Sequence, residues 1–350
     1  MVQASRYRLR QAARRAAIAG GLEAAWLMSR LGMVAGARGR GAIFTLHHVR
    51  PHASRGFAPN AHLEVTPEFL ARAIEQLRDD GYEFVPLGEI PALLADRDDR
   101  RRFAAFTLDD GYRNNAEFAL PVFARYGVPF TVFVTRGFAE RTHTIWWETL
   151  AELLSAKEEI SFNGGDRLSL RSPAEKTQAF LCIARHIVGS DEAAMIAELD
   201  ATARRHGIDA SAITARLTMS GQELATLAGH SLANLAAHTV SHRALAFLEP
   251  RHALEEMRQS ADYVEAIAGQ RPSAIAYPYG DTGSISPQVH GIAAEAGFAI
   301  AVTTRPGTLT SDHLGRLTSL PRISLNGFYQ KQRHVAALAS GIPFRLIRNG

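Results

Sequence analysis

The sequence predicts an α/β protein built on a mainly parallel sheet. Its 350 residues exceed one average domain but fit a single large α/β barrel with insertions. Short apolar β-rich runs alternate with helical patterns along the chain, which is typical of β–α–β units. With 46% hydrophobic and 21% charged residues, the chain has the composition of a globular protein with a sizeable core. The alternation alone leaves open whether the sheet closes into a barrel.

Eight short segments predict the strands of this sheet. They are Ala42–Leu46, Tyr82–Leu87, Phe103–Leu108, Pro129–Thr135, Ser231–Ala236, Ala274–Tyr277, Phe298–Thr303 and Leu320–Leu325. Helical spacing of apolar residues separates them, for example in residues 67–80 and 250–269. Gly or Asp-Gly at the ends of these helical runs fits helix C-caps.

Residues 138–218 interrupt the alternation and predict a mainly helical insertion. Such a segment either caps the active face or is an inert elaboration, and the sequence leaves both readings open. Trp146 and Trp147 open it, and an aromatic pair of this kind either stacks on sugar rings or anchors a core. The single cysteine, Cys182, excludes an internal disulfide, and its helical context predicts a packed core thiol.

Positive charge is concentrated at the N-terminus. Residues 1–40 contain eight arginines and one acid, Glu23, which gives +7, whereas the whole chain carries +4. The remaining residues therefore carry a net charge of −3, so this part of the protein is not expected to bind nucleic acid. No uncharged apolar run of 18 residues occurs, so no membrane span is predicted. We expect a basic helix that either contacts a membrane surface or packs on the barrel.

These observations predict that the chain has three parts, and they also predict where the protein is located in the cell. Residues 1–40 form a basic helical segment, residues 41–330 form the barrel with its insertion, and residues 331–350 form a C-terminal tail. We expect a cytoplasmic protein, with association with the inner membrane surface through the basic helix as the open alternative.

Polar residues follow four of the predicted strands. They are His47-His48, Asp109-Asp110, the pair His238 and His242, and Pro278-Tyr279-Gly280. The carboxyl ends of parallel strands share one edge, where active sites form in α/β proteins. On a helical turn, a spacing of four places both imidazoles on one face. Each motif is weak alone, but two histidines with one carboxylate form a set that leaves coordination positions open on a divalent metal.

Three sequence motifs resemble those of the polysaccharide deacetylases, a family also called the NodB-homology domain and similar to carbohydrate esterase family 4. Residues 106–112, FTLDDGY, resemble the first motif, residues 238–242, HTVSH, the second, and residues 276–280, AYPYG, the third. Residues 303–307, TTRPG, are also similar to a family segment. The resemblance covers roughly residues 42–325 and implies a distorted (β/α)7 TIM-like barrel.

The resemblance also implies a role for each matching residue. Asp109 corresponds to the catalytic base, and the backbone of Tyr279 corresponds to part of the oxyanion site. Asp110, His238 and His242 correspond to the metal ligands, and the metal in this family is usually Zn2+. The implied activity is hydrolytic removal of an N-acyl group, with acetyl as the expected one, from an amino sugar of a glycan or glycoconjugate.

The sequence departs from the family pattern at the supporting residues. Ala276 stands where many members have arginine, and we expect Arg322 to supply that charge. The usual Asp-x-x-Asp-Trp motif is missing, and so is the C-terminal Leu-x-His that carries the general acid; His313 and His334 lack its context.

The first predicted strand offers a replacement for the missing acid. It ends in Thr45-Leu46-His47-His48-Val49, which is similar to an N-terminal pattern in the subgroup that acts on exported poly-N-acetylglucosamine. His47 is therefore predicted as general acid, with His48 as the competitor. Because side chains alternate along a strand, His47 shares a face with Thr45.

Two other functions stay open. The same fold includes deformylases of lipid-linked sugars and amidases of cyclic amides, and a basic N-terminal helix suits a lipid-linked substrate. A non-catalytic carbohydrate-binding protein is the third alternative, because the standard supporting motifs are missing.

Overall fold

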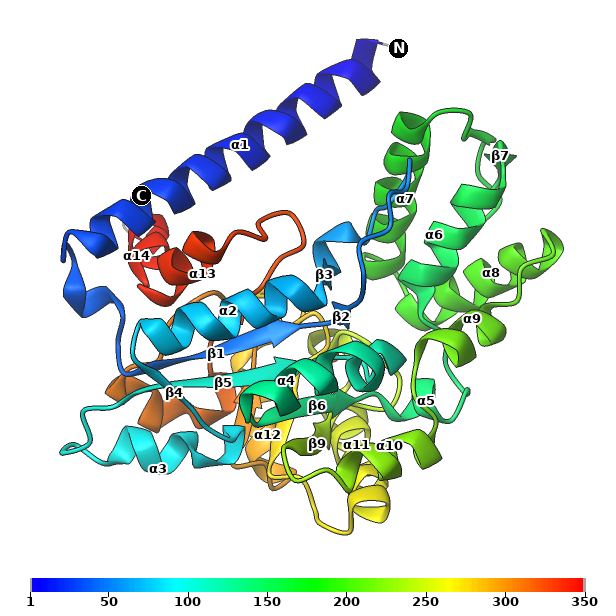
Figure 1. Ribbon diagram of the computed structural model, residues 1–350. Coiled ribbons are helices and arrows are strands. Elements are labelled where there is room, and N and C mark those ends of the chain that lie inside the picture. Colours follow the sequence, from blue (N-terminus) through cyan, green and yellow to red (C-terminus); the bar gives the residue numbers. More distant parts are fainter. Residues whose placement is uncertain (1, 349–350) are drawn as a thin grey trace.

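A computed structural model describes residues 2–348 and the side chains of residues 12–346. Its centre is a curled parallel sheet (Figure 1). The strands are β1 (Gly41–Leu46), β4 (Tyr82–Phe84), β5 (Arg102–Leu108), β6 (Phe130–Val134), β9 (Ala233–Ala237), β10 (Ala274–Ala276), β11 (Ile300–Val302) and β12 (Ile323–Ser324). Seven lie in the order β11-β10-β9-β6-β5-β1-β12, and β4 pairs with the beginning of β5. The predicted strands all lie at these positions, several of them shorter than expected.

The segment before β12 brings the two edges of the sheet together. Leu320 forms a parallel bridge with Val302 of β11, and the Thr303 N–H donates to the Leu320 carbonyl at 2.9 Å. Three residues later, Ile323 of β12 pairs with Phe44 of β1. The same short stretch therefore contacts both edge strands, and the sheet closes as the predicted distorted (β/α)7 barrel.

Side chains along each strand point alternately into the barrel and towards its outer face. In β5, Phe103 and Ala105 belong to an inner cluster, whereas Ala104 and Phe106 pack outward. Because the side-chain period is two, Thr107 and Asp109 continue the inner row of β5. This geometry decides which residues at the strand ends can face one another.

Helices cover the outer face of the barrel. They are α2 (Pro67–Asp79), α3 (Ile90–Ala95), α4 (Leu120–Tyr126), α10 (Gly221–Ala228), α11 (Pro250–Ala268) and α12 (Pro287–Glu295). Local sequence sets their ends: Thr66 caps α2 by accepting the Phe69 N–H at 3.1 Å, and Gly269, with φ +72°, terminates α11. A small pair, β2 (His48–Val49) and β3 (Glu64–Val65), follows β1.

Residues 138–218 form a mainly helical unit beside the barrel. It contains the end of α5 (Arg136–Ala139), then α6 (Trp146–Ala156), α7 (Pro173–Val188), α8 (Glu192–Arg205) and α9 (Ala210–Leu217), with the hairpin β7 (Glu159–Ile160) and β8 (Leu168–Ser169). Its buried residues form a cluster that includes Tyr112 of the barrel. The prediction of a core thiol within it is wrong: Cys182 is exposed on α7, because the buried face of α7 is formed by Ala179, Ile183 and Ile187.

The N-terminal helix packs against the C-terminal helices. α1 (Val2–Arg30) lies across α13 (Gln332–Ala339) and α14 (Ile342–Arg348), and extends past the barrel towards α7 (Figure 1). Leu22 and Ala25 are buried at this contact, and the Glu23 carboxylate forms ion pairs with Lys331 and Arg333 and lies 3.1 Å from His334 Nε2. Residues 332–339 and 342–348 thus form two helices that contact α1, and the predicted domain limits remain a prediction. Within residues 2–348, no helix combines the length and apolar character needed to cross a membrane.

Candidate active site

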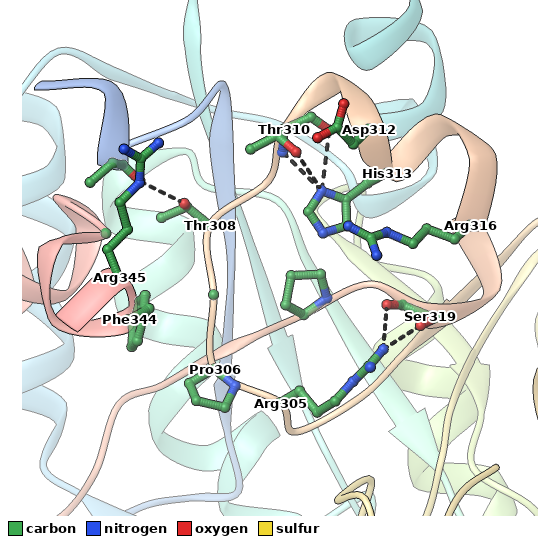
Figure 2. A pocket seen from close by; sticks show the side chains of 14 residues that line it. Arg305, Pro306, Thr308, Thr310, Asp312, His313, Arg316, Ser319, Phe344 and Arg345 are labelled. Atoms are coloured by element: carbon green, nitrogen blue, oxygen red, sulfur yellow. Dashed lines mark hydrogen bonds between the residues drawn. The ribbon is translucent and has the colours of Figure 1, made fainter. Parts of the chain in front are cut away.

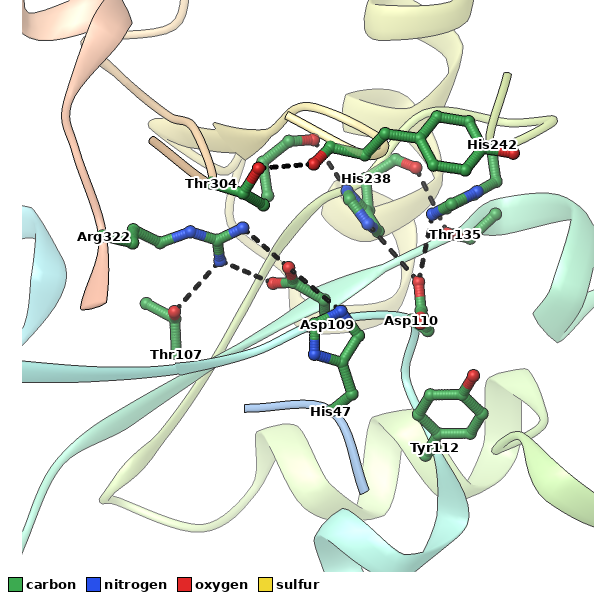
Figure 3. A network of polar contacts seen from close by, with 12 residues as sticks. His47, Thr107, Asp109, Asp110, Tyr112, Thr135, His238, His242, Thr304 and Arg322 are labelled. Carbon is green, nitrogen blue, oxygen red and sulfur yellow. Dashed lines mark hydrogen bonds and ion pairs between the residues drawn. The ribbon is translucent and has the colours of Figure 1, made fainter. Parts of the chain in front are cut away.

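Four polar side chains continue the inner rows of neighbouring strands at one end of the barrel. Thr45 of β1 pairs with Thr107 of β5, so His47 and Asp109 lie side by side two residues later. His238 continues the inner row of β9, which contains Ala236. Arg322 follows Leu320 on the segment that closes the barrel. Figure 3 shows these side chains pointing towards one another.

Asp110, His238 and His242 form a buried cluster with the donor set of a metal site. Their ligand atoms lie within 4.8 Å of one another. The Nε2 atoms of His238 and His242 lie 3.4 and 3.3 Å from Asp110 Oδ1. All three side chains are less than one-tenth exposed.

Hydrogen bonding around this cluster fits a divalent cation. The Nδ1–H of His238 donates to the Ala276 carbonyl at 2.7 Å, so Nε2 of a neutral ring carries a lone pair towards Asp110. Asp110 Oδ1 is buried and has no hydrogen-bond partner among the described residues. Buried lone pairs that converge without a donor are costly unless a cation lies between them. These residues would hold the metal with one oxygen and two nitrogens.

The backbone around the cluster adopts a conformation that side chains disfavour. Asp110, Thr239, His242 and Tyr279 have φ between +57° and +71°. They are four of the seven non-glycine residues with positive φ in the described chain. Residues 238–244 form an irregular loop, not the helical turn expected from the spacing of the histidines. Such strain persists only where surrounding contacts hold the backbone, and it concentrates at functional sites.

Glu256 of α11 holds the histidine loop in this conformation. Its carboxylate accepts the N–H groups of Val240 and Ser241 at 2.8 and 2.9 Å, and the Ser241 hydroxyl at 2.6 Å. Within the loop, the His242 N–H donates to the Thr239 hydroxyl at 3.1 Å. The metal-type ligands are thus fixed by a helix that follows them in the chain.

Arg322 forms a two-point ion pair with Asp109 inside the barrel. Its two terminal nitrogens donate to the two carboxylate oxygens, both at 2.7 Å, and its Nε donates to the Thr303 carbonyl at 2.9 Å. Burial raises the pKa of Asp109, but Arg322 outweighs it and the pKa lies below its ordinary value. The positive charge expected from Arg322 therefore lies directly beside the predicted base.

His47 faces Asp109, whereas His48 does not. His47 Nε2 lies 3.9 Å from Asp109 Oδ2, and its side chain is about one-fifth exposed. Burial lowers the pKa of His47, and the nearby Asp109 and Asp110 carboxylates only partly oppose this. His48, in β2, is fully buried: its ring packs against that of Tyr112 at a tilt of 33°, and its Nε2 lies 3.5 Å from Glu148.

Tyr279 is held at both ends by side chains from other elements. The Thr304 hydroxyl donates to its carbonyl at 2.6 Å. At its phenol oxygen, the Trp146 indole N–H donates at 2.9 Å, and the phenol donates to Glu192 Oε1 at 2.5 Å. The other Glu192 oxygen accepts the Ala244 N–H at 3.0 Å. The helical insertion therefore fixes the ring that packs against His242.

The two tryptophans of the insertion pack beside Tyr279 and His242. Trp146 and Trp147 are only 6% and 7% exposed. The Trp147 indole N–H donates to the Tyr112 hydroxyl at 3.0 Å, and its ring lies 4.9 Å from that of His242. Burial and these hydrogen bonds favour the interpretation as core anchors over stacking on a sugar ring.

Sequence reasoning missed Glu192 and Glu256. Both lie on amphipathic helices rich in acids, where a carboxylate usually faces solvent. Glu192 also follows the N-cap Asp191, and acids are common in the first turn of a helix, so its position suggests no special role. Glu192 is 9% exposed and the Glu256 side chain 11% exposed, and this low exposure depends on contacts with distant parts of the chain.

The barrel thus carries a histidine–carboxylate cluster at the carboxyl ends of its strands, the edge where active sites of such barrels lie. The model of the polysaccharide deacetylase family matches residues 96–180 and 197–301, which is more than half of the chain. This protein therefore belongs to the polysaccharide deacetylase family and is a hydrolytic deacetylase.

Solved structures share the fold. The Streptococcus pyogenes deacetylase PplD, in complex with acetate, is 19% identical with a TM-score of 0.51, covering 82% of this chain and 92% of that one. IcaB from Ammonifex degensii is 18% identical with a TM-score of 0.54, covering 86% and 97%. BC0361, a polysaccharide deacetylase from Bacillus cereus, is 15% identical with a TM-score of 0.54, covering 85% and 68%. No curated protein matches the sequence.

Replacing Arg322 is expected to leave a buried, unpaired carboxylate. Arg322→Met should lower the free energy of unfolding by about 3–5 kcal/mol, because Asp109 loses its partner inside the barrel. The double variant Arg322→Met/Asp109→Asn should be more stable than Arg322→Met alone, because no buried charge remains. Urea unfolding measures both quantities. Equal stability of Arg322→Met and the native chain would contradict the ion pair.

Glu192 and Tyr279 are expected to be energetically coupled. Glu192→Ala should cost about 1–3 kcal/mol, because the Tyr279 hydroxyl and the Ala244 N–H lose a buried acceptor. Tyr279→Phe removes the hydroxyl, so the double variant should cost less than the sum of the two single changes. The measurement is a double-mutant cycle by urea unfolding, and strictly additive costs would show that this contact is not formed.

Proposed function

We propose that this deacetylase is a metal-dependent enzyme that removes N-acetyl groups from the amino sugars of a glycan or glycoconjugate. The observation that carries the proposal is the buried Asp110–His238–His242 cluster, whose lone pairs converge beside the Asp109–Arg322 pair. A bound divalent ion, with Zn2+ as the expected one, supplies Lewis acidity to the amide carbonyl and acidity to a water.

Asp109 is the proposed base. It lies beside the metal-type ligands, and Arg322 holds both of its oxygens in a fixed orientation. Its lowered pKa keeps it ionised at neutral pH, so it can accept a proton from the attacking water. The backbone N–H of Tyr279 is the proposed donor to the developing oxyanion, and its strained, clamped position suits a preorganised donor.

His47 is the proposed general acid. An amine cannot leave as an anion, so a proton must reach the sugar nitrogen. His47 is partly exposed and lies 3.9 Å from Asp109, where a proton taken up from water arrives. Because burial lowers the pKa of His47, the ring rests in the neutral form and must be protonated during the reaction cycle. The competing residue, His48, is fully buried and contacts Tyr112 and Glu148 instead of Asp109.

Acetate release from N-acetylglucosamine oligomers tests the proposal. Asp109→Asn and His47→Gln should each lower kcat about 100- to 10,000-fold, the range of a lost general base or acid. Asp110→Asn should lose both activity and stoichiometric metal, whereas Asp109→Asn should retain the metal, because only Asp110 belongs to the ligand set.

Matched controls separate these roles from general damage. His252→Gln changes an exposed histidine on α11 and should leave acetate release unchanged. Circular dichroism checks that each variant is folded. Zinc-loaded protein that releases no acyl group from any amino sugar, or an Asp110→Asn variant with full metal content, would contradict the proposal.

A specific feature favours a membrane-linked substrate as a second candidate. α1 exposes Ile18 and Leu27 at 41% and 54%, together with Arg14 and Arg30, and Leu31, directly after the helix, is 68% exposed. An apolar surface with basic residues beside it fits peripheral binding to an anionic membrane. The candidate function is deacylation, including deformylation, of an amino sugar on a lipid carrier at the inner membrane surface, by a protein otherwise located in the cytoplasm.

Sedimentation with vesicles of phosphatidylcholine and phosphatidylglycerol tests this surface. Leu27→Ser/Leu31→Ser should weaken binding about tenfold or more, because two apolar side chains are lost from the contact. The control is Phe247→Ser, which changes a 68% exposed side chain outside α1. Deleting residues 1–40 is less informative, since Leu22 and Ala25 belong to a packed cluster. Equal binding of the double variant and the native chain would remove the membrane argument.

A further inference from the structure

A second polar pocket lies outside the candidate active site. It has a volume of about 510 Å³ and is formed by residues 305–321 on one side and by Ala37, Phe344 and Arg345 on the other (Figure 2). Neither Asp109 nor the metal-type ligands line it. Most of its inner wall comes from the loop after β11 and from η6 (Ser311–Ser319), a 3-10 helix with a kink.

The pocket gathers positive charge. Arg305, Arg316 and Arg345 line it, and Asp312 is the only acid among its lining residues. In the described part of the chain, Arg305 and Arg345 donate to Ser319 and to the Gly36 carbonyl, and none of the three arginines forms an ion pair with a carboxylate. Arg316 and Arg345 are exposed and Arg305 is partly buried, so two of these cations face solvent and the third is held in the wall of the pocket.

Arg305 is held in place without being neutralised. One of its terminal nitrogens donates to the Ser319 carbonyl at 3.1 Å and to the Ser319 hydroxyl. Its Nε is buried and has no hydrogen-bond partner among the described residues. Burial lowers the pKa of Arg305, and the nearby Arg316 lowers it further by like-charge repulsion. An anion between the two guanidinium groups would relieve both effects.

His313 adds a neutral donor to this wall. The side chain is nine-tenths buried, and its Nδ1 accepts the Thr310 N–H at 3.0 Å. The hydrogen of the neutral ring is therefore on Nε2. Burial lowers the pKa of His313, which keeps the ring neutral. Figure 2 shows the ring inside the pocket, between Thr310 and Arg316.

We propose that this pocket binds a phosphate-bearing anion. Planar guanidinium groups match phosphate oxygens with paired hydrogen bonds, and a dianion suits three cations better than acetate or another monoanion does. The volume lies in the range of sites for small ligands, so it accommodates a phosphate with an organic group attached. The ligand is either a soluble phosphate compound or the headgroup of a phospholipid.

The two sources differ in how the ligand arrives. Ala37 lines the pocket and follows α1, and the Arg345 guanidinium donates to the Gly36 carbonyl at 2.8 Å. The pocket therefore adjoins the chain that carries the exposed apolar residues Met33 and Val34. A lipid headgroup would reach the site from a membrane at this surface, whereas a soluble phosphate would enter from water.

Calorimetric titration of the full chain with inorganic phosphate and with pyrophosphate tests the site. The native chain should bind at least one of them, and Arg305→Gln and Arg316→Gln should each weaken binding about tenfold. Arg100→Gln, an exposed arginine between α3 and β5 with no partner at the pocket, is the matched control and should bind as the native chain does. Melting temperatures verify that each variant is folded.

Two further experiments distinguish this site from the active site and identify whether the ligand is a soluble compound or a lipid headgroup. Asp110→Asn should retain phosphate binding, because the metal-type ligands do not line the pocket. Vesicles of phosphatidylcholine with and without phosphatidic acid give the membrane arm. Binding to phosphatidic acid that Arg316→Gln weakens identifies a headgroup site, whereas binding of soluble phosphate alone identifies a soluble ligand. The inference is overturned if the native chain binds none of these probes, if the arginine variants bind equally well, or if Asp110→Asn abolishes binding.

Discussion

The arrangement of the candidate site depends on one buried ion pair, between Arg322 and Asp109. A charged pair inside a barrel is costly to desolvate, and it persists here because both carboxylate oxygens and the guanidinium find partners at good distances. Arg322 lies on the segment that bridges β11 and β1, so the pair also ties the barrel closure to the end of β5. Asp109 is thereby kept ionised and correctly oriented, whereas its neighbour Asp110 is turned by its positive φ towards the histidines. One strand end thus supplies two carboxylates with different surroundings, and different proposed roles follow from those surroundings.

Around this pair, the protein stabilises a strained backbone with contacts from outside the barrel. The histidine loop depends on Glu256 of α11, and Tyr279 depends on Trp146 and Glu192 of the insertion. Left-handed conformations at bulky residues cost free energy, and a buried carboxylate that accepts two or three hydrogen bonds can offset that cost. The insertion therefore contributes to the geometry of the site, which answers the question of whether it is an inert elaboration.

Much of the fold and of the candidate site could be predicted, because the strands and helices follow local periodicity and the site residues stand in motifs at the strand ends. Alternation along β1 places His47 on the face of Thr45, and the register with β5 then places it beside Asp109. Arg322 could be predicted as the substitute for the family arginine, because the family pattern shows which positive charge this sequence lacks. Glu192 and Glu256 could not be found in this way, since their contacts with the two loops depend on how helices pack and leave no periodic signal. Cys182 was wrongly predicted as buried because apolar residues lie on both faces of α7, including the exposed Leu181.

The segment from residue 303 to 322 connects the two polar centres of the molecule. It supplies Thr304 and Arg322 to the candidate active site and Arg305 and Arg316 to the basic pocket. The Arg322 N–H donates to the Arg305 carbonyl at 3.0 Å, so the two arginines lie on adjacent, hydrogen-bonded backbone but point to different sites. One is neutralised by a carboxylate of the chain and the other is not. Arg305 retains a buried Nε without a partner among the described residues, and an anion from outside the protein would supply the neutralisation that Asp109 supplies to Arg322.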